Sequence, residues 1–218
     1  MKNTMNGHEK NLRMVQLALL TTVLVVLQLF ATFLIRVGVV APTLALIPLV
    51  IGSAALGVKA GAILGAVFGL VAFICGLTGF DAFTNAMIMY KPAETIIICF
   101  LKGILAGVLA ALVYKCFIKL FKKKKNVFIP SLLASIIAPV ANTAIYVLGM
   151  AMFFRDMVTD ANGDAIYSSN EALITVMIGV FLIIIGNFIL EVIVTGVVTP
   201  VITSLLAKNK TFKKLLIK

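Results

Sequence analysis

The sequence has 218 residues, of which 62% are hydrophobic and 12% are charged. A soluble domain carries about 25% charged and about 45–50% apolar residues, so this composition excludes an ordinary soluble protein and indicates an integral membrane protein. The net charge is +11, but the basic residues cluster at the ends of apolar runs without interleaved aromatic residues, which argues against a nucleic-acid partner. The three cysteines and the single histidine show no metal-ligand spacing, so neither a metal site nor a cofactor is expected.

Six apolar runs predict an all-α integral membrane protein with six transmembrane helices, at residues 14–35, 43–56, 60–77, 95–121, 127–154 and 173–206. The second run is short and contains Pro48, so we expect it to be tilted, kinked or partly re-entrant. The last run is long, and Pro200 is expected to kink it near its end. The chain is therefore divided into a polar tail, one six-helix membrane domain and a basic tail, at residues 1–13, 14–206 and 207–218.

Two connections are long enough to have roles of their own. Residues 78–94 are mixed polar and aromatic, and are predicted to be a loop that covers a site from outside. Residues 155–172 form the one clearly hydrophilic loop.

The distribution of basic residues predicts the orientation. With six spans, fifteen lysines and arginines fall on the side of both termini, and three (Arg36, Lys91 and Arg155) fall on the other side. Loops rich in lysine and arginine stay in the cytoplasm, so both termini are predicted to be cytoplasmic.

A glycine row begins between the second and third runs and continues into the third run. Gly57, Gly61, Gly65 and Gly69 recur every four residues, a spacing that places them along one side of a helix. Such a row lets a second helix approach closely in a bilayer. We expect it to pack against another helix, in this protein or in a partner, and we expect ligand chemistry to lie elsewhere.

Enzymatic motifs such as HExxH, GxSxG and a phosphate-binding loop are missing from the sequence, so the protein is not expected to be an enzyme. Instead, Lys102, Asn142, Tyr146, Asn187 and Glu191 are polar residues inside apolar runs. A charge at mid-bilayer costs about 2.5–3.5 kcal/mol on insertion scales, and such residues usually face a cavity or one another.

These residues predict a polar pocket between the last three runs that opens outward, in which Lys102 pairs with a ligand carboxylate or phosphate. Phe83 and Asn85 of the 78–94 loop would complete it as parts of a lid. A structural interpretation stays open, in which Lys102 and Glu191 neutralise each other and Asn142 and Tyr146 only join helices. For Glu191, a structural or coupling role is expected rather than ligand contact.

Several short motifs carry a resemblance to a known family. They are Ile47-Pro48, GVKAGA at residues 57–62, LGAVFG at 64–69 and LKGILAG at 101–107. Together with six short helices they resemble the membrane-embedded S components of energy-coupling factor (ECF) vitamin transporters, over residues 12–206. The family often has proline where this chain has Val58.

The resemblance implies a subunit in the plasma membrane of a prokaryote that binds a vitamin near the outer face. It implies as partners a transmembrane coupling subunit (T component) and two cytoplasmic ATPases, which supply the energy. A small-residue face on the first helix, here Ala18 and Thr22, would contact the coupling subunit. The motifs are most similar to the pantothenate and riboflavin branches. An anionic pantothenate suits Lys102, and the lack of tryptophan disfavours a flavin stacking site.

Other assignments stay open. Among vitamins these are riboflavin, folate and a queuosine-type precursor. Among other classes they are a self-sufficient secondary transporter, which an internal repeat would have supported, and a non-transporting membrane scaffold.

Overall fold

The structure is a computed structural model that describes residues 7–34, 43–121, 126–154, 170–209, 212 and 215–217. Over these ranges it contains seven helices and no strand, which confirms the all-α prediction. The helices are α1 (Gly7–Leu34), α2 (Leu46–Leu56), α3 (Val58–Leu77), α4 (Ala82–Tyr90), α5 (Pro92–Phe121), α6 (Phe128–Phe153) and α7 (Asn170–Leu206). The four consecutive lysines at 122–125, which are among the fifteen basic residues counted above, and most of the predicted hydrophilic loop at 155–172 lie outside the described residues.

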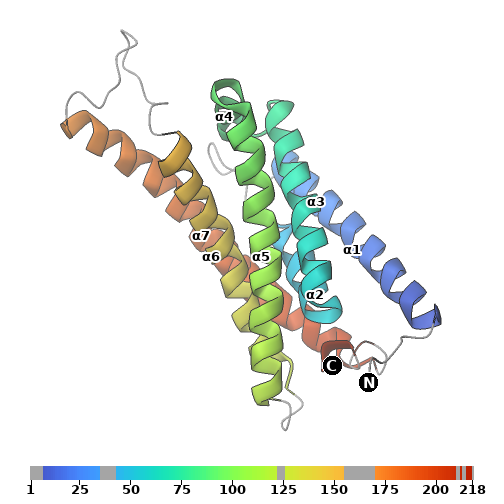
Figure 1. Ribbon diagram of the computed structural model, residues 1–218. Coiled ribbons are helices and arrows are strands. Elements are labelled where there is room, and N and C mark those ends of the chain that lie inside the picture. Colours follow the sequence, from blue (N-terminus) through green and yellow to red (C-terminus); the bar gives the residue numbers. More distant parts are fainter. Residues whose placement is uncertain are drawn as a thin grey trace.

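The helices run side by side in alternating directions (Figure 1). Both chain ends lie at one end of the bundle, and α4 lies at the other. Five apolar stretches of the described helices are long enough to cross a membrane, namely Asn11–Phe33, Val58–Leu77, Pro92–Phe121, Phe128–Phe153 and Ile184–Leu206. The protein is therefore a multi-pass membrane protein. With 11 residues, α2 spans only about 16 Å, roughly half of a bilayer's hydrocarbon core.

The short helix α2 lies at the centre of the bundle. It packs against α1, α3, α5, α6 and α7, and ten of its eleven residues are buried. Pro48 is the third residue of the helix, where a backbone N–H would have no partner within the helix, so the proline is tolerated. A helix that is apolar all round is stable here because protein surrounds it on every side.

The predicted loop at 78–94 contains a helix, and in this respect the prediction was wrong. The Asp81 carboxylate caps α4 by accepting hydrogen bonds from the Thr84 backbone N–H (3.2 Å) and the Thr84 hydroxyl (2.6 Å). Gly79, with φ 78°, makes the turn from α3. An aspartate is a preferred N-cap residue. The helix that follows Asp81 has only nine residues, which is too few for a recognisable helical pattern of apolar residues.

The glycine row joins α3 to α5. A side chain at Gly61 would meet the Gly107 backbone, one at Gly65 would meet Gly103, and one at Gly69 would meet the backbone of Cys99. The two backbones are thus in contact at three successive levels of α3, where the glycines have no Cβ that would hold the helices apart.

Gly57, which the sequence places in the same row, differs from the other three. Its φ is 91°, and a Cβ there would meet nothing within 4 Å. Gly57 therefore provides the left-handed turn that ends α2 and begins α3. Gly57 therefore packs against no helix of the described chain, and packing against a partner subunit stays a prediction.

Hydroxyl groups of α7 contact α6 close to a proline inside α6. Pro139 lies inside α6 and has no N–H for the carbonyl of Ser135, four residues earlier. The Thr195 hydroxyl of α7 lies 3.1 Å from that carbonyl and is shared with the Glu191 carbonyl of its own helix. The neighbouring helix thus offers a donor to the group that the proline leaves free. Farther along, the Thr203 hydroxyl donates to Ser131 Oγ at 2.9 Å.

Candidate ligand-binding site

Lys102 lies among aromatic rings in the half of α5 that is nearer to α4. Its Nζ is 4.5 Å from the centroid of the Tyr146 ring on α6 and 5.9 Å from that of Phe68 on α3. Both distances are within the range of cation–π attraction, which favours a desolvated cation by up to about 2 kcal/mol. The aromatic rings hold the ammonium group in place and leave it able to donate hydrogen bonds, because a ring face takes none of its three protons in a conventional bond.

Tyr146 is itself fixed by α4. Its hydroxyl lies 3.3 Å from Met87 Sδ, and its ring is 6.1 Å from the Phe83 ring in a tilted arrangement. Met87 is fully buried, and Phe83 packs on the same small cluster. The predicted residues Lys102, Tyr146 and Phe83 are thus brought together, with Phe83 and Met87 above them at the α4 end.

A second polar group surrounds Glu191 on α7. One carboxylate oxygen, Oε1, accepts a hydrogen bond from the Thr43 backbone N–H at 3.2 Å and one from Asn187 Nδ2 at 3.1 Å. Glu191 is 2% exposed, and Lys102 lies near enough to interact with it electrostatically. In the described part of the chain the two form no direct ion pair.

Of the five polar residues that the sequence places inside apolar runs, two have a buried oxygen acceptor without a hydrogen-bond partner among the described residues. These acceptors are Oε2 of Glu191 and Oδ1 of Asn142. A buried acceptor without a partner costs about 1–3 kcal/mol, so such groups in a native protein call for an explanation, of which an absent ligand is one. One free cation and two free acceptors could together bind a molecule that has both an anionic group and hydrogen-bond donors.

Asn85 stands apart from this arrangement. Its Nδ2 donates to the Gly76 carbonyl at 2.8 Å, which ties α4 to the end of α3. Lys91 ties the other end of α4 to α6, with its Nζ donating to the Phe153 carbonyl at 2.7 Å. Both side chains therefore hold α4 over the end of the bundle that lies opposite to the termini.

Three further residues, which the sequence does not predict as ligand residues, each lie near Lys102 or Tyr146. Phe68 and Glu191 lie near Lys102, and Met87 contacts Tyr146. Phe68 could have been found by aligning the glycines of α3 with those of α5. If Gly65 meets Gly103, then Phe68 must lie near Lys102, because antiparallel neighbours run past each other at the same rise per residue. Met87 gave no signal beyond its apolar character.

The predicted coupling residues lie on the surface. Ala18 and Thr22 are both exposed on α1, and the Thr22 hydroxyl donates to the Ala18 carbonyl at 3.1 Å. Larger apolar side chains around them, including Val15 and Leu19, are more than 60% exposed. This face of α1 is therefore available to lipid or to another protein.

Comparison with known proteins identifies the family. The chain matches the family "ECF transporter, substrate-specific component" over residues 12–203. The protein belongs to this family. It is also similar to the pantothenic acid transporter PanT of Lactococcus lactis subsp. cremoris (strain MG1363), with 29% identity over 207 residues, which cover 89% of this chain and 93% of PanT. As a substrate-specific component, the protein is a transport subunit, and the resemblance drawn from its sequence motifs is confirmed.

Proposed function

We propose that this S component binds pantothenate with high affinity in the site around Lys102. The observation that carries the proposal is the Lys102 ammonium group held 4.5 Å from the Tyr146 ring with the unpartnered acceptors Glu191 Oε2 and Asn142 Oδ1 as further polar groups of the buried interior. Pantothenate offers one carboxylate for the lysine, and its two hydroxyls and amide N–H are donors for such acceptors. The similarity to PanT supports the same substrate.

The ligand would enter between α4 and the outer ends of α5, α6 and α7. In this proposal Phe83 and Tyr146 cover the apolar middle of the ligand, and Asn187 holds Glu191 in position. Asn85 contributes by holding α4 in place rather than through the donor that Gly76 already uses.

The wider assembly is also part of the proposal. The protein would lie in the plasma membrane of a prokaryote with six spans, the short α2 among them, and with both termini in the cytoplasm. A T component and two ATPases would supply the energy, and the exposed face around Ala18 and Thr22 would meet the T component.

Ligand binding is tested with the purified full-length protein in nanodiscs. Titration calorimetry and thermal unfolding should show a specific complex with pantothenate, with stabilisation of about 2.7 kcal/mol at a ligand concentration 100 times the Kd. Riboflavin and folate serve as comparison ligands. Stabilisation by riboflavin and not by pantothenate would overturn the substrate assignment, and stabilisation by no vitamin would favour a scaffold.

Transport is tested in proteoliposomes with and without the coupling subunit and its ATPases. Uptake of radiolabelled pantothenate should require the complete complex and ATP. Uptake by this chain alone, driven by an ion gradient, would mean that it is a secondary transporter.

A further inference from the structure

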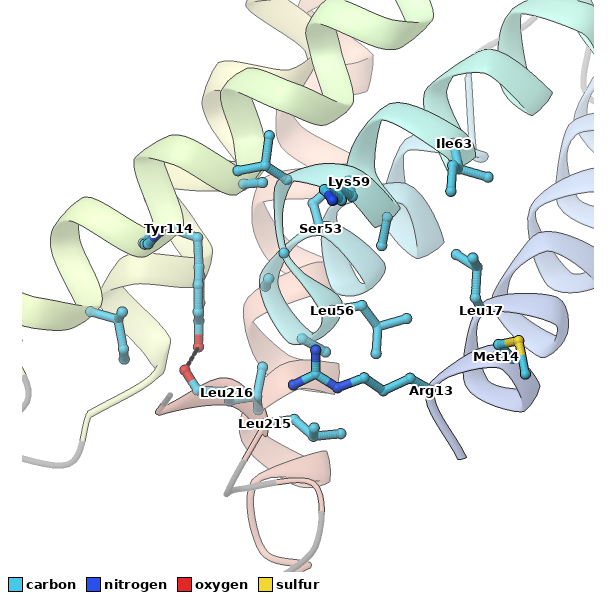
Figure 2. Close-up of a pocket in the computed structure, with 18 residues that line it drawn as sticks. Arg13, Met14, Leu17, Ser53, Leu56, Lys59, Ile63, Tyr114, Leu215 and Leu216 are labelled. Atoms are coloured by element: carbon cyan, nitrogen blue, oxygen red, sulfur yellow. Dashed lines mark hydrogen bonds between the residues drawn. The ribbon is translucent and has the colours of Figure 1, made fainter. Parts of the chain in front are cut away.

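A cavity lies at the end of the bundle that holds both termini, far from the Lys102 site. Its volume is about 530 Å³, and α1, α2, α3, α5 and the C-terminal residues Leu215 and Leu216 line it. None of its lining residues belongs to the group around Lys102 and Tyr146. Figure 2 shows it between the Arg13 to Leu17 segment of α1 and the start of α3, with the Tyr114 hydroxyl bound to the Leu216 carbonyl at one side.

The charges of this cavity have one sign. Arg13, Lys59 and Lys115 line it, and its described lining includes no aspartate or glutamate. Lys59 and Lys115 are exposed and Arg13 is half-buried. Figure 2 shows the Arg13 side chain reaching from α1 across the cavity towards Leu56 and Leu215. Three cations from three different helices therefore surround a single space, and they would attract an anion into it.

Most of the other lining residues are apolar, and the apolar surface continues onto the outside of the bundle. Met14 and Ile63 line the cavity and are 54% and 49% exposed, and farther along α3 Leu70 and Ile74 are also exposed. In a membrane protein such side chains contact acyl chains. The cavity thus combines a basic end with a hydrophobic flank that lies against the bilayer. One buried polar atom of the lining, Ser53 Oγ, has no hydrogen-bond partner.

We infer that this cavity binds one anionic phospholipid. The phosphate would lie among Arg13, Lys59 and Lys115, and an acyl chain would follow the apolar surface between α1 and α3. A lipid fits better than a free phosphate because a small inorganic anion would leave the apolar wall of Leu17, Leu56 and Ile63 uncovered. Basic pockets between transmembrane helices are suited to anionic headgroups on physical grounds. The bound lipid would hold α1 against α3 next to the exposed face of α1 around Ala18 and Thr22.

Native mass spectrometry of the full-length protein tests this inference. The protein is exchanged into detergent with equal amounts of phosphatidylglycerol and phosphatidylcholine, and the retained lipid is counted. We expect one phosphatidylglycerol to be retained in preference to phosphatidylcholine. In the double variant Lys59→Gln/Lys115→Gln, its affinity should fall by about tenfold or more, because each basic residue near a lipid surface changes binding by about fivefold.

The matched control is Lys119→Gln/Lys208→Gln. Both lysines are exposed, neither lines the cavity, and the change in net charge is the same. Lipid retention should be unchanged in this control. An equal loss in the two double variants, or no preference for phosphatidylglycerol in the natural protein, would overturn the inference.

Two further measurements distinguish a bound lipid from other occupants of the cavity. Glycerophosphate, which has the headgroup chemistry without acyl chains, should not displace the lipid; if it does, the cavity is a simple phosphate site and the inference fails. Unchanged lipid retention in Lys59→Gln/Lys115→Gln, together with loss of binding to the purified coupling subunit, would identify the cavity as a protein docking site instead. Pantothenate affinity should stay the same in both variants, so this test does not depend on the proposed substrate.

Discussion

The Nζ of Lys102 lies 4.5 Å from the centroid of the Tyr146 ring, so a cation on α5 is held in place by an aromatic ring on α6. In the described part of the chain no carboxylate pairs with it directly. The tyrosine in turn is held by Met87 and Phe83 of α4. The ammonium group of Lys102 is therefore stabilised by the face of an aromatic ring, and its N–H groups can still donate hydrogen bonds to a ligand.

The first prediction concerns the charge of Lys102. Lys102→Gln should weaken pantothenate binding by about 10- to 100-fold, since a hydrogen bond to a charged group contributes about 1.5–3 kcal/mol. Titration calorimetry measures the affinity, and Lys119→Gln on the same helix is the control. Unchanged affinity in Lys102→Gln would show that the lysine does not pair with the carboxylate.

The second prediction separates the ring of Tyr146 from its hydroxyl. Tyr146→Phe keeps the ring over Lys102 and removes the hydroxyl that contacts Met87 Sδ, so ligand affinity should fall by no more than about fivefold, given that a typical neutral hydrogen bond contributes about 1 kcal/mol. Tyr146→Leu removes the cation–π contact and should weaken binding by about tenfold. If the two variants bind equally well in calorimetry, the ring does not position the lysine.

The third prediction rests on the unpartnered Oδ1 of Asn142. Asn142→Leu replaces a buried amide by an apolar group of similar size, so the ligand-free protein should be as stable as before or more stable. Its affinity for pantothenate should nevertheless fall. Thermal unfolding with and without ligand measures both quantities. A loss of stability in the ligand-free protein would mean that Asn142 joins helices and does not bind the ligand.

The fourth prediction concerns the contact between α3 and α5. Gly65→Ala would place a Cβ against the backbone of Gly103, and separating the helices should cost about 1–3 kcal/mol. Gly186→Ala on α7 is the matched control, because a Cβ there meets nothing within 4 Å and the change should be neutral or slightly stabilising. Thermal unfolding in detergent compares the two. Equal stability of both variants would contradict the proposed close contact.

The fifth prediction concerns the exposed face of α1. Ala18→Trp should leave pantothenate affinity unchanged and reduce binding to the T component, because a large ring would obstruct close approach of a second helix. Val197→Trp serves as the control on α7, where Val197 is 61% exposed. Co-purification with the coupling subunit and its ATPases is the measurement. Full assembly of the Ala18→Trp variant would exclude this face as the interface.

Much of the fold could be predicted because the bilayer requires it. An apolar run of about 20 residues without charge must form a helix that satisfies its own backbone, so the long helices α1, α3, α5, α6 and α7 follow from composition alone. The boundaries at Gly57 and Pro92 also follow from local chemistry, since a left-handed residue and a proline end or begin helices. The helix α4 could not be read from apolar periodicity, because nine residues give too short a pattern.

Candidate site residues were predictable as a class but not as an arrangement. Lys102, Asn142, Tyr146 and Asn187 attract attention because polar groups are costly in a membrane, and this holds whatever they contact. Whether Lys102 would pair with Glu191 or lie over Tyr146 depends on the rotation of α5 relative to its neighbours. Local sequence patterns do not specify that rotation, because it depends on how the helices pack against one another.

By itself, then, the sequence determined the helical membrane architecture, the family and the set of costly polar residues, because each depends on local composition and on short motifs. The tertiary structure alone decided the partners of those residues. The close contact between α3 and α5 brings Lys102 to Phe68. The capped helix α4 places Phe83 and Met87 against Tyr146. It also decided that Gly57 turns the chain while Gly65 packs. Four identical residues at equal spacing have different roles because only three of them meet another backbone.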